Sequence, residues 1–213
     1  MTEYIFFIGL AFFTNILSVF MQTKKVKFLF ISIIECIGII IGSKLFEILC
    51  DFEYYYCLVK NAEFNLNHIL SGYAYTGGII GGIITLMIIS KIFGEKMDKL
   101  FIIFVPNLFL IYSISKIGCY LNGCCEGIII NNFRIPIQLI ESVIALILYN
   151  IVWSQKNVVA FFFISYGIFR FIFEFFREDT YFYGSLTQIM SVAFIFLGMI
   201  LYSRKEGMRI DTK

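Results

Sequence analysis

The sequence predicts an all-α integral membrane protein, a bundle of about seven helices that cross a lipid bilayer. Three observations lead to this fold class: 60% of the 213 residues are hydrophobic, only 15% are charged, and the mean hydropathy is +0.87. A soluble domain would have to expose much of this apolar surface to water. In a bilayer, helices are expected because each one satisfies its own backbone hydrogen bonds.

Seven apolar stretches have, or nearly have, the length of a spanning helix, about 20 residues. The first is preceded by Glu3 instead of a basic run and is followed by no small-residue cleavage site, so we expect a retained helix. We find no internal repeat, low-complexity tract or linker, so residues 1–213 are expected to form a single transmembrane domain. The predicted helices are 4–21, 26–49, 75–93, 100–119, 138–153, 158–176 and 186–202.

Basic residues are unequally divided between alternate connections. Short cytoplasmic loops retain Lys and Arg, so the asymmetry predicts an N-terminus outside and a C-terminus in the cytoplasm. The formal net charge of +2 is too small to indicate a nucleic-acid partner. The cytoplasmic side is assigned Lys24, Lys25, Lys27, Lys91, Lys96, Lys99, Lys156, Arg204, Lys205, Arg209 and Lys213, against Lys60, Arg134 and Arg177 on the outer side.

Several charged residues fall within or at the end of predicted spans. A charge in hydrocarbon costs about 2.5 to 3.5 kcal/mol, so such residues should face the bundle interior, form pairs or bind a substrate. For Glu35, Lys44 and Glu47, a functional role and internal salt bridges or snorkelling are equally open interpretations. The others are Lys116, Glu141, Arg170 and Glu174.

Arg170, Glu174 and Arg177 stand at i, i+4 and i+7, so they are predicted to share one helix face. Their neighbours are mostly Phe and Ile, so this polar stripe should face the bundle interior. A polar slot beside a hydrophobic wall suits an amphiphile. The alternative is a purely structural internal salt bridge.

A glycine-rich block, 72–82, opens the third predicted helix. For Gly81 and Gly82 we prefer close helix packing through small residues. Gly77 and Gly78 are expected instead to let the backbone approach a ligand, since the amide groups at a helix N-terminus favour a phosphate.

Three of the six cysteines, Cys119, Cys124 and Cys125, lie close together in the sequence. A zinc site needs a fourth ligand, and the only histidine, His68, lies in another loop, so we predict no metal. Outside the cytoplasm a disulfide is chemically allowed, and buried apolar cysteines are the commoner case. We expect structural rather than nucleophilic thiols, because only Lys116 is near enough in sequence to lower a thiol pKa.

Polar residues also open the fifth and seventh predicted helices. Pro136 suits a first helical turn, after which Gln138 and Glu141 share a face. Thr187 and Gln188 open the last helix in a similar way. Polar residues from five regions are therefore predicted to converge on one side of the membrane.

Five blocks in this order resemble the prolipoprotein diacylglyceryl transferase family across nearly the whole chain. Block 75–82 resembles its glycine-rich segment, and 116–127 resembles its R-x-G-N-x-x-N-G signature. Block 135–141 resembles H-P-x-Q-x-x-E, and Gln188 with Ser191 resembles G-Q-x-x-S. The most specific block is 166–177, which is close to a complete Y-G-x-x-R-x-x-x-E-F-F-R.

The resemblance implies transfer of a diacylglyceryl group from phosphatidylglycerol to a lipobox cysteine thiol of a prolipoprotein. It places the reaction at the outer face of the bacterial cytoplasmic membrane, in contact with membrane lipids, with release of glycerol phosphate and without cofactor, metal or nucleotide. Fixed cations suit a phosphate leaving group. The implied catalytic residues are Lys116, Arg170 and Glu174, and the implied substrate-binding residues are Tyr75, Thr76, Gly77, Gly78, Asn122, Gly123, Gln138, Glu141, Arg177 and Gln188.

The chain departs from the family pattern at residues that bear on the chemistry. Thr76 replaces a histidine, and threonine cannot accept a proton near neutral pH. Lys116 replaces an arginine, which keeps the charge but loses bidentate phosphate geometry. The remaining departures are Cys119 for asparagine, Cys124 for an acidic residue with Glu126 nearby, and Ile135 for histidine.

Two other classes of function are considered beside the transferase. One is a member of the family that lacks the reaction and binds phospholipid or lipopeptide, or transfers lipid to a different acceptor. The other is a small transporter, for which repeat symmetry and paired broken helices are expected and are not found in the sequence.

Overall fold

The computed structural model describes residues 2–61, 65, 68, 72–178 and 180–203. The predicted basic tail, Arg204, Lys205, Arg209 and Lys213, lies outside these residues. Each of the seven predicted stretches is mostly helical. A short antiparallel hairpin of β1 (Ile129–Ile130) and β2 (Phe133–Arg134) precedes the fifth of them. The helices are α1 (Thr2–Thr23), α2 (Val26–Cys50), α3 (Phe52–Lys60), α5 (Tyr75–Phe93), α6 (Met97–Phe104), α7 (Asn107–Leu121), α8 (Ile137–Trp153), α9 (Val158–Glu174) and α10 (Thr180–Ser203).

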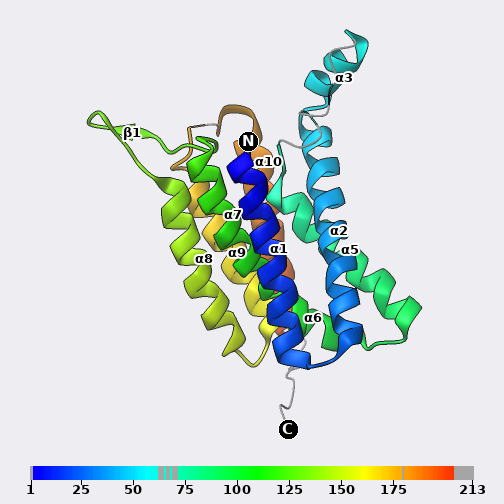
Figure 1. Cartoon of the computed structure of the whole chain (residues 1–213). Coiled ribbons are helices and arrows are strands. Elements are labelled where there is room, and N and C mark those ends of the chain that lie inside the picture. Colours follow the sequence, from blue (N-terminus) through cyan, green and yellow to red (C-terminus); the bar gives the residue numbers. More distant parts are fainter. Residues whose placement is uncertain (1, 62–64, 66–67, 69–71, 179, 204–213) are drawn as a thin grey trace.

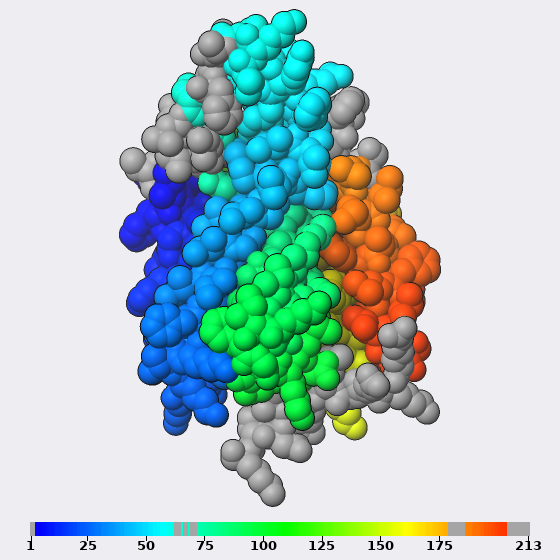
Figure 2. Space-filling model, turned by 90° about the vertical axis from the view of Figure 1, so that its right-hand side faces the viewer, coloured from blue at the N-terminus to red at the C-terminus, as the bar shows by residue number. Residues whose placement is uncertain are grey.

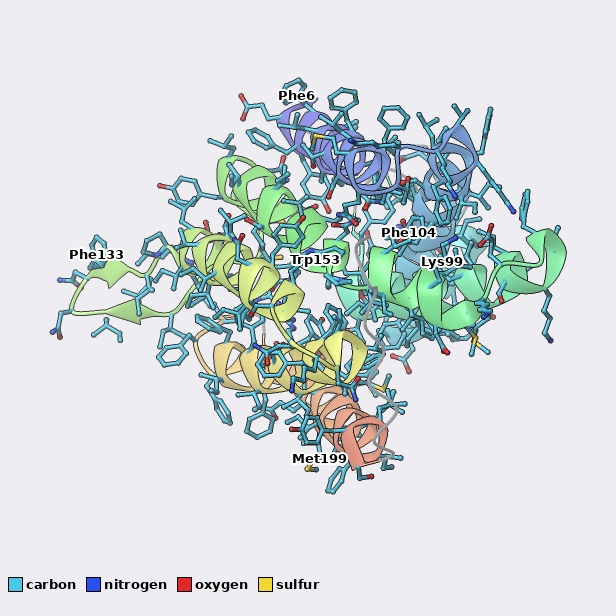
Figure 3. The ribbon with its side chains drawn as sticks, turned by 90° about the horizontal axis from the view of Figure 1, so that it is seen from below. Phe6, Lys99, Phe104, Phe133, Trp153 and Met199 are labelled. Atoms are coloured by element: carbon cyan, nitrogen blue, oxygen red, sulfur yellow. The ribbon has the colours of Figure 1, made fainter. Side chains whose placement is uncertain are left out.

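The helices have the length and the outward apolar surface that a bilayer requires. Among the described residues, five segments are long and apolar enough to cross a membrane: α1, α2, α5, α6 with α7, and α10; α8 is a shorter apolar helix. Phe6 and Met199 point away from the bundle, whereas Phe104 lies inside it (Figure 3). The protein is therefore an all-α, multi-pass integral membrane protein, as the sequence predicts.

The helices pack as closely connected pairs (Figure 1). α2 packs mainly on α5, α9 on α10, and α7 on both α1 and α8. Figure 2 shows α2 and α5 side by side on one face, with α3 projecting beyond the end of the bundle. The largest apolar core lies around α7 and α9 and includes Phe109, Tyr112, Phe162 and Tyr166.

The structure corrects the predicted helix 100–119, which is divided into α6 and α7. The break falls at Val105 and Pro106, between the last residue of α6 and the first of α7. Proline has no N–H to continue the hydrogen bonds of α6, and it forms the N-cap of α7 instead.

Three other features differ from the sequence prediction. α3 and the β1–β2 hairpin were not predicted, and both lie at the end of the bundle where α2 and α7 finish (Figure 1). α10 begins at Thr180 instead of near Leu186, so Gln188 lies inside the helix and not in its first turn. Short polar or aromatic segments such as α3 lack the long apolar run by which spanning helices are recognised.

Candidate functional site

A buried charged cluster joins α7, α8 and α9 near one end of the bundle. The Lys116 Nζ atom lies 2.5 Å from Glu141 Oε2, and Arg170 contacts the other oxygen of the same carboxylate at 3.4 Å. The second guanidinium nitrogen of Arg170 lies 2.9 Å from Glu174 Oε2. We refer to Lys116, Glu141, Arg170 and Glu174 as the charged cluster; all four are buried.

All four residues of the charged cluster were candidate site residues in the sequence. Glu141 forms ion pairs with two of the three residues predicted to be catalytic, Lys116 and Arg170. Glu174 forms an ion pair with Arg170, as their i, i+4 spacing on one helix face allows. Burying so many charges is tolerated only because each has an opposite charge within contact distance.

An aromatic residue that the sequence analysis did not single out completes the surroundings of Lys116. Its Nζ atom lies 5.1 Å from the ring centroid of Tyr112, a cation–π distance. Tyr112 is buried and also packs edge-on against Tyr75 and Phe169. Its position four residues before Lys116, on the same helix face, is the sequence signal that identifies it.

Arg177 corrects the prediction of one continuous polar stripe, because α9 ends at Glu174. Arg177 instead forms an isolated β-bridge with Gly127, which brings it beside the loop after α7. From there it interacts electrostatically with Glu141 and with Cys125. It therefore belongs to the same site, although not through helical spacing.

The loop after α7 is held against α8 and the end of α9. Gln138 donates from Nε2 to the backbone oxygen of Cys124 at 2.9 Å, which explains why this predicted substrate-binding amide is buried. Asn122 forms the exposed C-cap of α7, next to Gly123 with φ +65°. Among the described residues, no hydrogen bond or ion pair joins Gln138 or Asn122 to the charged cluster.

An exposed ion-paired trio lies farther out on the same loop. Arg134 contacts the carboxylates of both Glu126 and Glu178. Phe133, beside Arg134 in the hairpin, points away from the bundle (Figure 3). This trio ties the hairpin to the segment after α9, an arrangement that no sequence spacing indicates.

The start of α5 contacts the core near the charged cluster through Tyr75. Its hydroxyl donates to the Leu108 backbone oxygen, and its ring lies 4.5 Å from Tyr112 and 5.9 Å from Tyr166, centroid to centroid. Thr76 is buried in the same first turn. The two residues are thus close to the cluster's aromatic surroundings, as predicted for this block.

Gly77 and Gly78 lie in the contact between α5 and α2. A Cβ atom at Gly77 would stand 2.2 Å from Phe46 Cβ, and one at Gly78 would stand 2.5 Å from Ser43 Oγ. Both glycines therefore have the close-packing role that the sequence analysis gave to Gly81. A ligand-binding role for Gly77 and Gly78 stays a prediction.

Gln188 is half-buried in α10, which packs along α9. Ser191, from the same block, is buried, and its backbone oxygen lies 2.6 Å from where a Gly167 side chain would begin. This block therefore fixes the close approach of α9 and α10. Among the described residues, no hydrogen bond or ion pair joins Gln188 to the charged cluster.

Three thiols gather beside the charged cluster. The sulfur atoms of Cys119, Cys124 and Cys125 all lie within 4.8 Å of one another, and we call these residues the three-thiol cluster. All six cysteines lie in the described residues and none forms a disulfide. Hydrogen bonds from the other two thiols lower the pKa of Cys125 well below its usual range, and nearby Lys116 and Arg177 act in the same direction.

The other charges inside the helices have structural partners. Asn15 donates to Glu35 Oε2 at 2.9 Å, and Lys44 lies 2.6 Å from Glu47 Oε2. Lys44 also donates to the Tyr55 hydroxyl at 2.8 Å. These contacts favour the structural interpretation of Glu35, Lys44 and Glu47 over a functional one.

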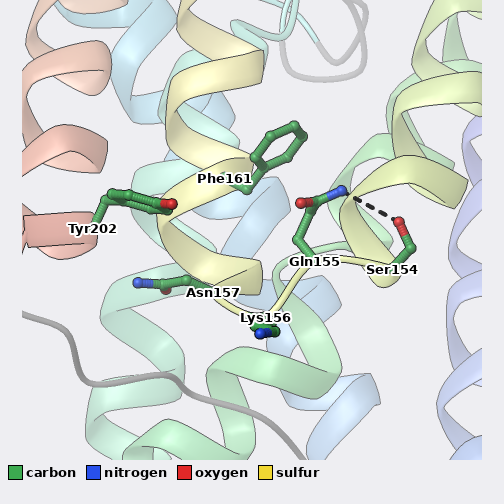
Figure 4. A pocket seen from close by; sticks show the side chains of 6 residues that line it. All are labelled: Ser154, Gln155, Lys156, Asn157, Phe161 and Tyr202. Carbon is green, nitrogen blue, oxygen red and sulfur yellow. Dashed lines mark hydrogen bonds between the residues drawn. The ribbon is translucent and has the colours of Figure 1, made fainter.

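A surface pocket lies at the opposite end of α9 (Figure 4). The rise of about 1.5 Å per helical residue separates Asn157, in its wall, from Arg170 by about 20 Å. The pocket is therefore distinct from the charged cluster. Its lining residues are Ser154, Gln155, Lys156, Asn157, Phe161 and Tyr202.

Comparison with known proteins identifies the family of the chain. A family model described as prolipoprotein diacylglyceryl transferase matches residues 2–204.

Three similar proteins carry the name phosphatidylglycerol–prolipoprotein diacylglyceryl transferase. The one from Clostridium tetani is 28% identical over 193 residues, covering 80% of this chain and 75% of its own length. The one from Finegoldia magna is 30% identical over 199 residues, covering 82% and 77%. The one from Streptococcus uberis is 29% identical over 203 residues, covering 79% and 76%. The chain thus belongs to the prolipoprotein diacylglyceryl transferase family.

Proposed function

We propose that this protein transfers the diacylglyceryl group of phosphatidylglycerol to the lipobox cysteine thiol of a prolipoprotein, at the outer face of the bacterial cytoplasmic membrane. The observation that carries the proposal is the buried charged cluster, with Arg177 beside it. The names of the similar proteins support both substrates.

The charges of the site match an anionic headgroup. Lys116, Arg170 and Arg177 bring three positive charges and Glu141 and Glu174 bring two negative ones, which leaves one positive charge in excess. A phosphodiester carries one negative charge and would neutralise it. Arg170 offers a planar guanidinium suited to two phosphate oxygens, whereas Lys116 acts as a point charge.

In the proposed step, the acceptor sulfur forms a bond to the glycerol carbon that carries the phosphate. The bond between that carbon and the phosphate oxygen breaks, and glycerol phosphate leaves with the bonding electrons. Fixed cations stabilise the charge that develops on this oxygen. The thiol proton passes to a base, for which Glu126 and Glu174 are the carboxylate candidates.

The experiment is transfer from labelled phosphatidylglycerol to a lipobox peptide by the purified protein in detergent. Arg170→Ala should lower turnover by about 100-fold or more, the usual loss when a group that stabilises developing charge is removed. Arg170→Lys should recover part of the activity, because it restores charge without the forked geometry. Lys156→Ala, which removes a cation at the opposite end of α9, is the matched control and should turn over normally.

A thermal melt of each variant separates the chemical role of Arg170 from a structural one. Removing one partner of a buried ion pair destabilises a protein by about 3 to 5 kcal/mol. An Arg170→Ala protein that melts earlier but still binds phosphatidylglycerol and turns over like the wild type would rule out the phosphate role.

A second candidate function is binding of phospholipid or lipopeptide without transfer. Thr76 favours it, because this buried residue replaces the histidine expected in the family block and offers no proton acceptor. Binding of phosphatidylglycerol with no labelled peptide product, across a series of lipobox sequences, is the result that would select this candidate over the transferase.

A further inference from the structure

We propose that Cys119, Cys124 and Cys125 bind one thiophilic metal ion, with Zn²⁺ as the expected occupant and its fourth coordination position open. The sequence analysis predicted no metal because it required a fourth protein ligand. Zinc sites with three protein ligands and an exchangeable fourth position are, however, a regular class.

The spacing of the sulfur atoms suits one shared ion. All three lie within 4.8 Å of one another. Zn–S bonds of about 2.3 Å in tetrahedral geometry place ligand sulfurs about 3.8 Å apart. The thiols would therefore have to approach one another by about 1 Å at most, which small side-chain rotations supply.

The backbone around the three-thiol cluster is fixed by one hydrogen bond within the cluster and one from α8. The Cys124 N–H donates to the Cys119 oxygen at 3.1 Å, and Gln138 holds the Cys124 oxygen at 2.9 Å. Cys125 has φ 58°, a left-handed conformation that a residue with a side chain adopts only where its surroundings impose it. This turn brings Cys125 back toward Cys119 at the end of α7.

The surrounding charges suit a thiolate-bound zinc ion. Lys116 and Arg177 both act electrostatically on Cys125, so the three sulfur ligands lie beside positive side chains. Sulfur ligands select soft or borderline ions such as zinc over magnesium or calcium. Cys119 is buried, whereas Cys124 and Cys125 are half-buried, which leaves a path for the ion and space for a fourth ligand.

The test is the zinc content of the intact protein, purified in detergent under reducing conditions and loaded with Zn²⁺ alone. The wild type should retain one zinc ion per chain after a weak chelator removes loosely bound metal. Cys124→Ser and Cys125→Ser should each lose it. Cys57→Ser, which removes an exposed thiol of α3 far from the cluster, should retain it.

Cobalt and alkylation provide readouts that do not depend on activity. Co²⁺ should give a thiolate-to-metal charge-transfer band in the wild type and in Cys57→Ser, and no such band in the other two variants. In the wild type, Zn²⁺ should slow alkylation of Cys124 and Cys125 but not of Cys57, so the proposal remains testable even where a serine variant fails to fold. Equal zinc content in all variants, alkylation unaffected by Zn²⁺, or a disulfide within the cluster of the reduced-purified protein would each overturn it.

Discussion

Glu141 determines the geometry of the charged cluster, because one carboxylate forms ion pairs with two cations on different helices. One of its oxygens contacts Lys116 of α7 and the other contacts Arg170 of α9, while Glu174 holds the second guanidinium nitrogen. Arg170 is therefore oriented from two sides before any lipid binds. Such pre-organisation lowers the cost of fixing a phosphate, since the cation need not be immobilised during the reaction.

Thr76 leads to a prediction at the scale of one residue. Thr76→His should raise transfer to a lipobox peptide, because imidazole accepts a thiol proton near neutral pH, and a well-placed general base contributes about 10²- to 10⁴-fold. The gain should increase with pH through about 6.5, the ordinary pKa of histidine. Turnover across a pH series is the measurement.

Because Thr76 is buried in the first turn of α5, the same variant needs a thermal melt. A variant that folds normally but shows no gain at any pH would contradict this explanation. It would direct attention to Glu126 or Glu174 as the proton acceptor.

The contact between α2 and α5 depends on glycine, and it gives a prediction at the scale of one element. A Cβ atom at Gly81 would stand 2.4 Å from the Gly38 backbone oxygen and 2.8 Å from Gly42 Cα, so one helix would have to move. Gly81→Ala should destabilise the protein by about 1 to 3 kcal/mol, the usual cost of overpacking. Thermal unfolding in detergent measures it.

Gly9→Ala is the matched control for this prediction, because a Cβ atom at Gly9 in α1 meets nothing within 4 Å. Because alanine favours the helical backbone more than glycine does, Gly9→Ala should stabilise the folded protein by about 0.5 to 1 kcal/mol. If both variants melt at the same temperature, the α2–α5 contact is not the tight one that the structure shows.

The connection between α5 and α6 contains an ion pair whose effect should depend on pH. Glu95 lies 2.9 Å from Lys27 of α2 and 3.1 Å from Lys99 of α6. Hydrogen bonds from Lys27 and then Lys99 lower the pKa of Glu95. The folded protein therefore holds this carboxylate ionised more firmly than the unfolded chain does, and the stabilisation exists above the unfolded pKa and disappears as pH falls through the lower, folded value.

Glu95→Gln should accordingly lower the melting temperature at pH 7, by an amount equivalent to about 1 kcal/mol or less because the lysines are solvent-exposed. The difference from wild type should shrink in acid and in high salt. Glu53→Gln, at an exposed glutamate of α3, controls for loss of one carboxylate. A difference that is the same at every pH would show that the ion pair is not its cause.

Much of the helical arrangement was predictable from sequence, because a run of apolar residues about 20 long is a local signal. Features that depend on a single backbone group were not: Pro106 divides one predicted span, and Arg177 lies beyond the last hydrogen-bonded turn of α9. Arg170 with Glu174 was predictable, since i, i+4 spacing fixes their proximity.

Contacts between segments that are far apart in the sequence could not be predicted from the spacing of residues. The loop that carries Cys124 is folded by a positive φ at Cys125 and by a bond from Gln138 of another helix. The trio of Glu126, Arg134 and Glu178 likewise joins three separate segments. Such positions depend on contacts within the folded backbone. For this reason the sequence showed that the three cysteines are neighbours along the chain, and only the structure showed that the sulfur atoms of the three-thiol cluster lie together.

At the scale of the whole molecule, the two ends of the bundle differ in charge and in chemistry. The turn between α1 and α2, with Lys24 and Lys25, and the connection with Lys156 lie at one end (Figure 1). The hairpin and α3 lie toward the other end. The charged cluster lies there too, because its residues stand near the end of α7, the start of α8 and the end of α9. By the positive-inside rule, we expect the lysine-rich end to face the cytoplasm. The charged cluster would then face the outer leaflet, where the proposed acceptor would be exposed.

This orientation can be tested by labelling with a membrane-impermeant maleimide, located by peptide mass spectrometry. Native Cys57 is exposed in α3, so it should label in intact cells. Lys24→Cys and Ser203→Cys place thiols in the α1–α2 turn and at the end of α10, and both should label only after the membrane is permeabilised. The two thiols at the lysine-rich end must label from the same side, and Cys57 at the opposite end must label from the other side. If Lys24→Cys and Ser203→Cys label from different sides, the number of crossings is wrong. If both label in intact cells while Cys57 does not, the bundle is inverted, and the charged cluster would then face the cytoplasm and lose access to an exported acceptor.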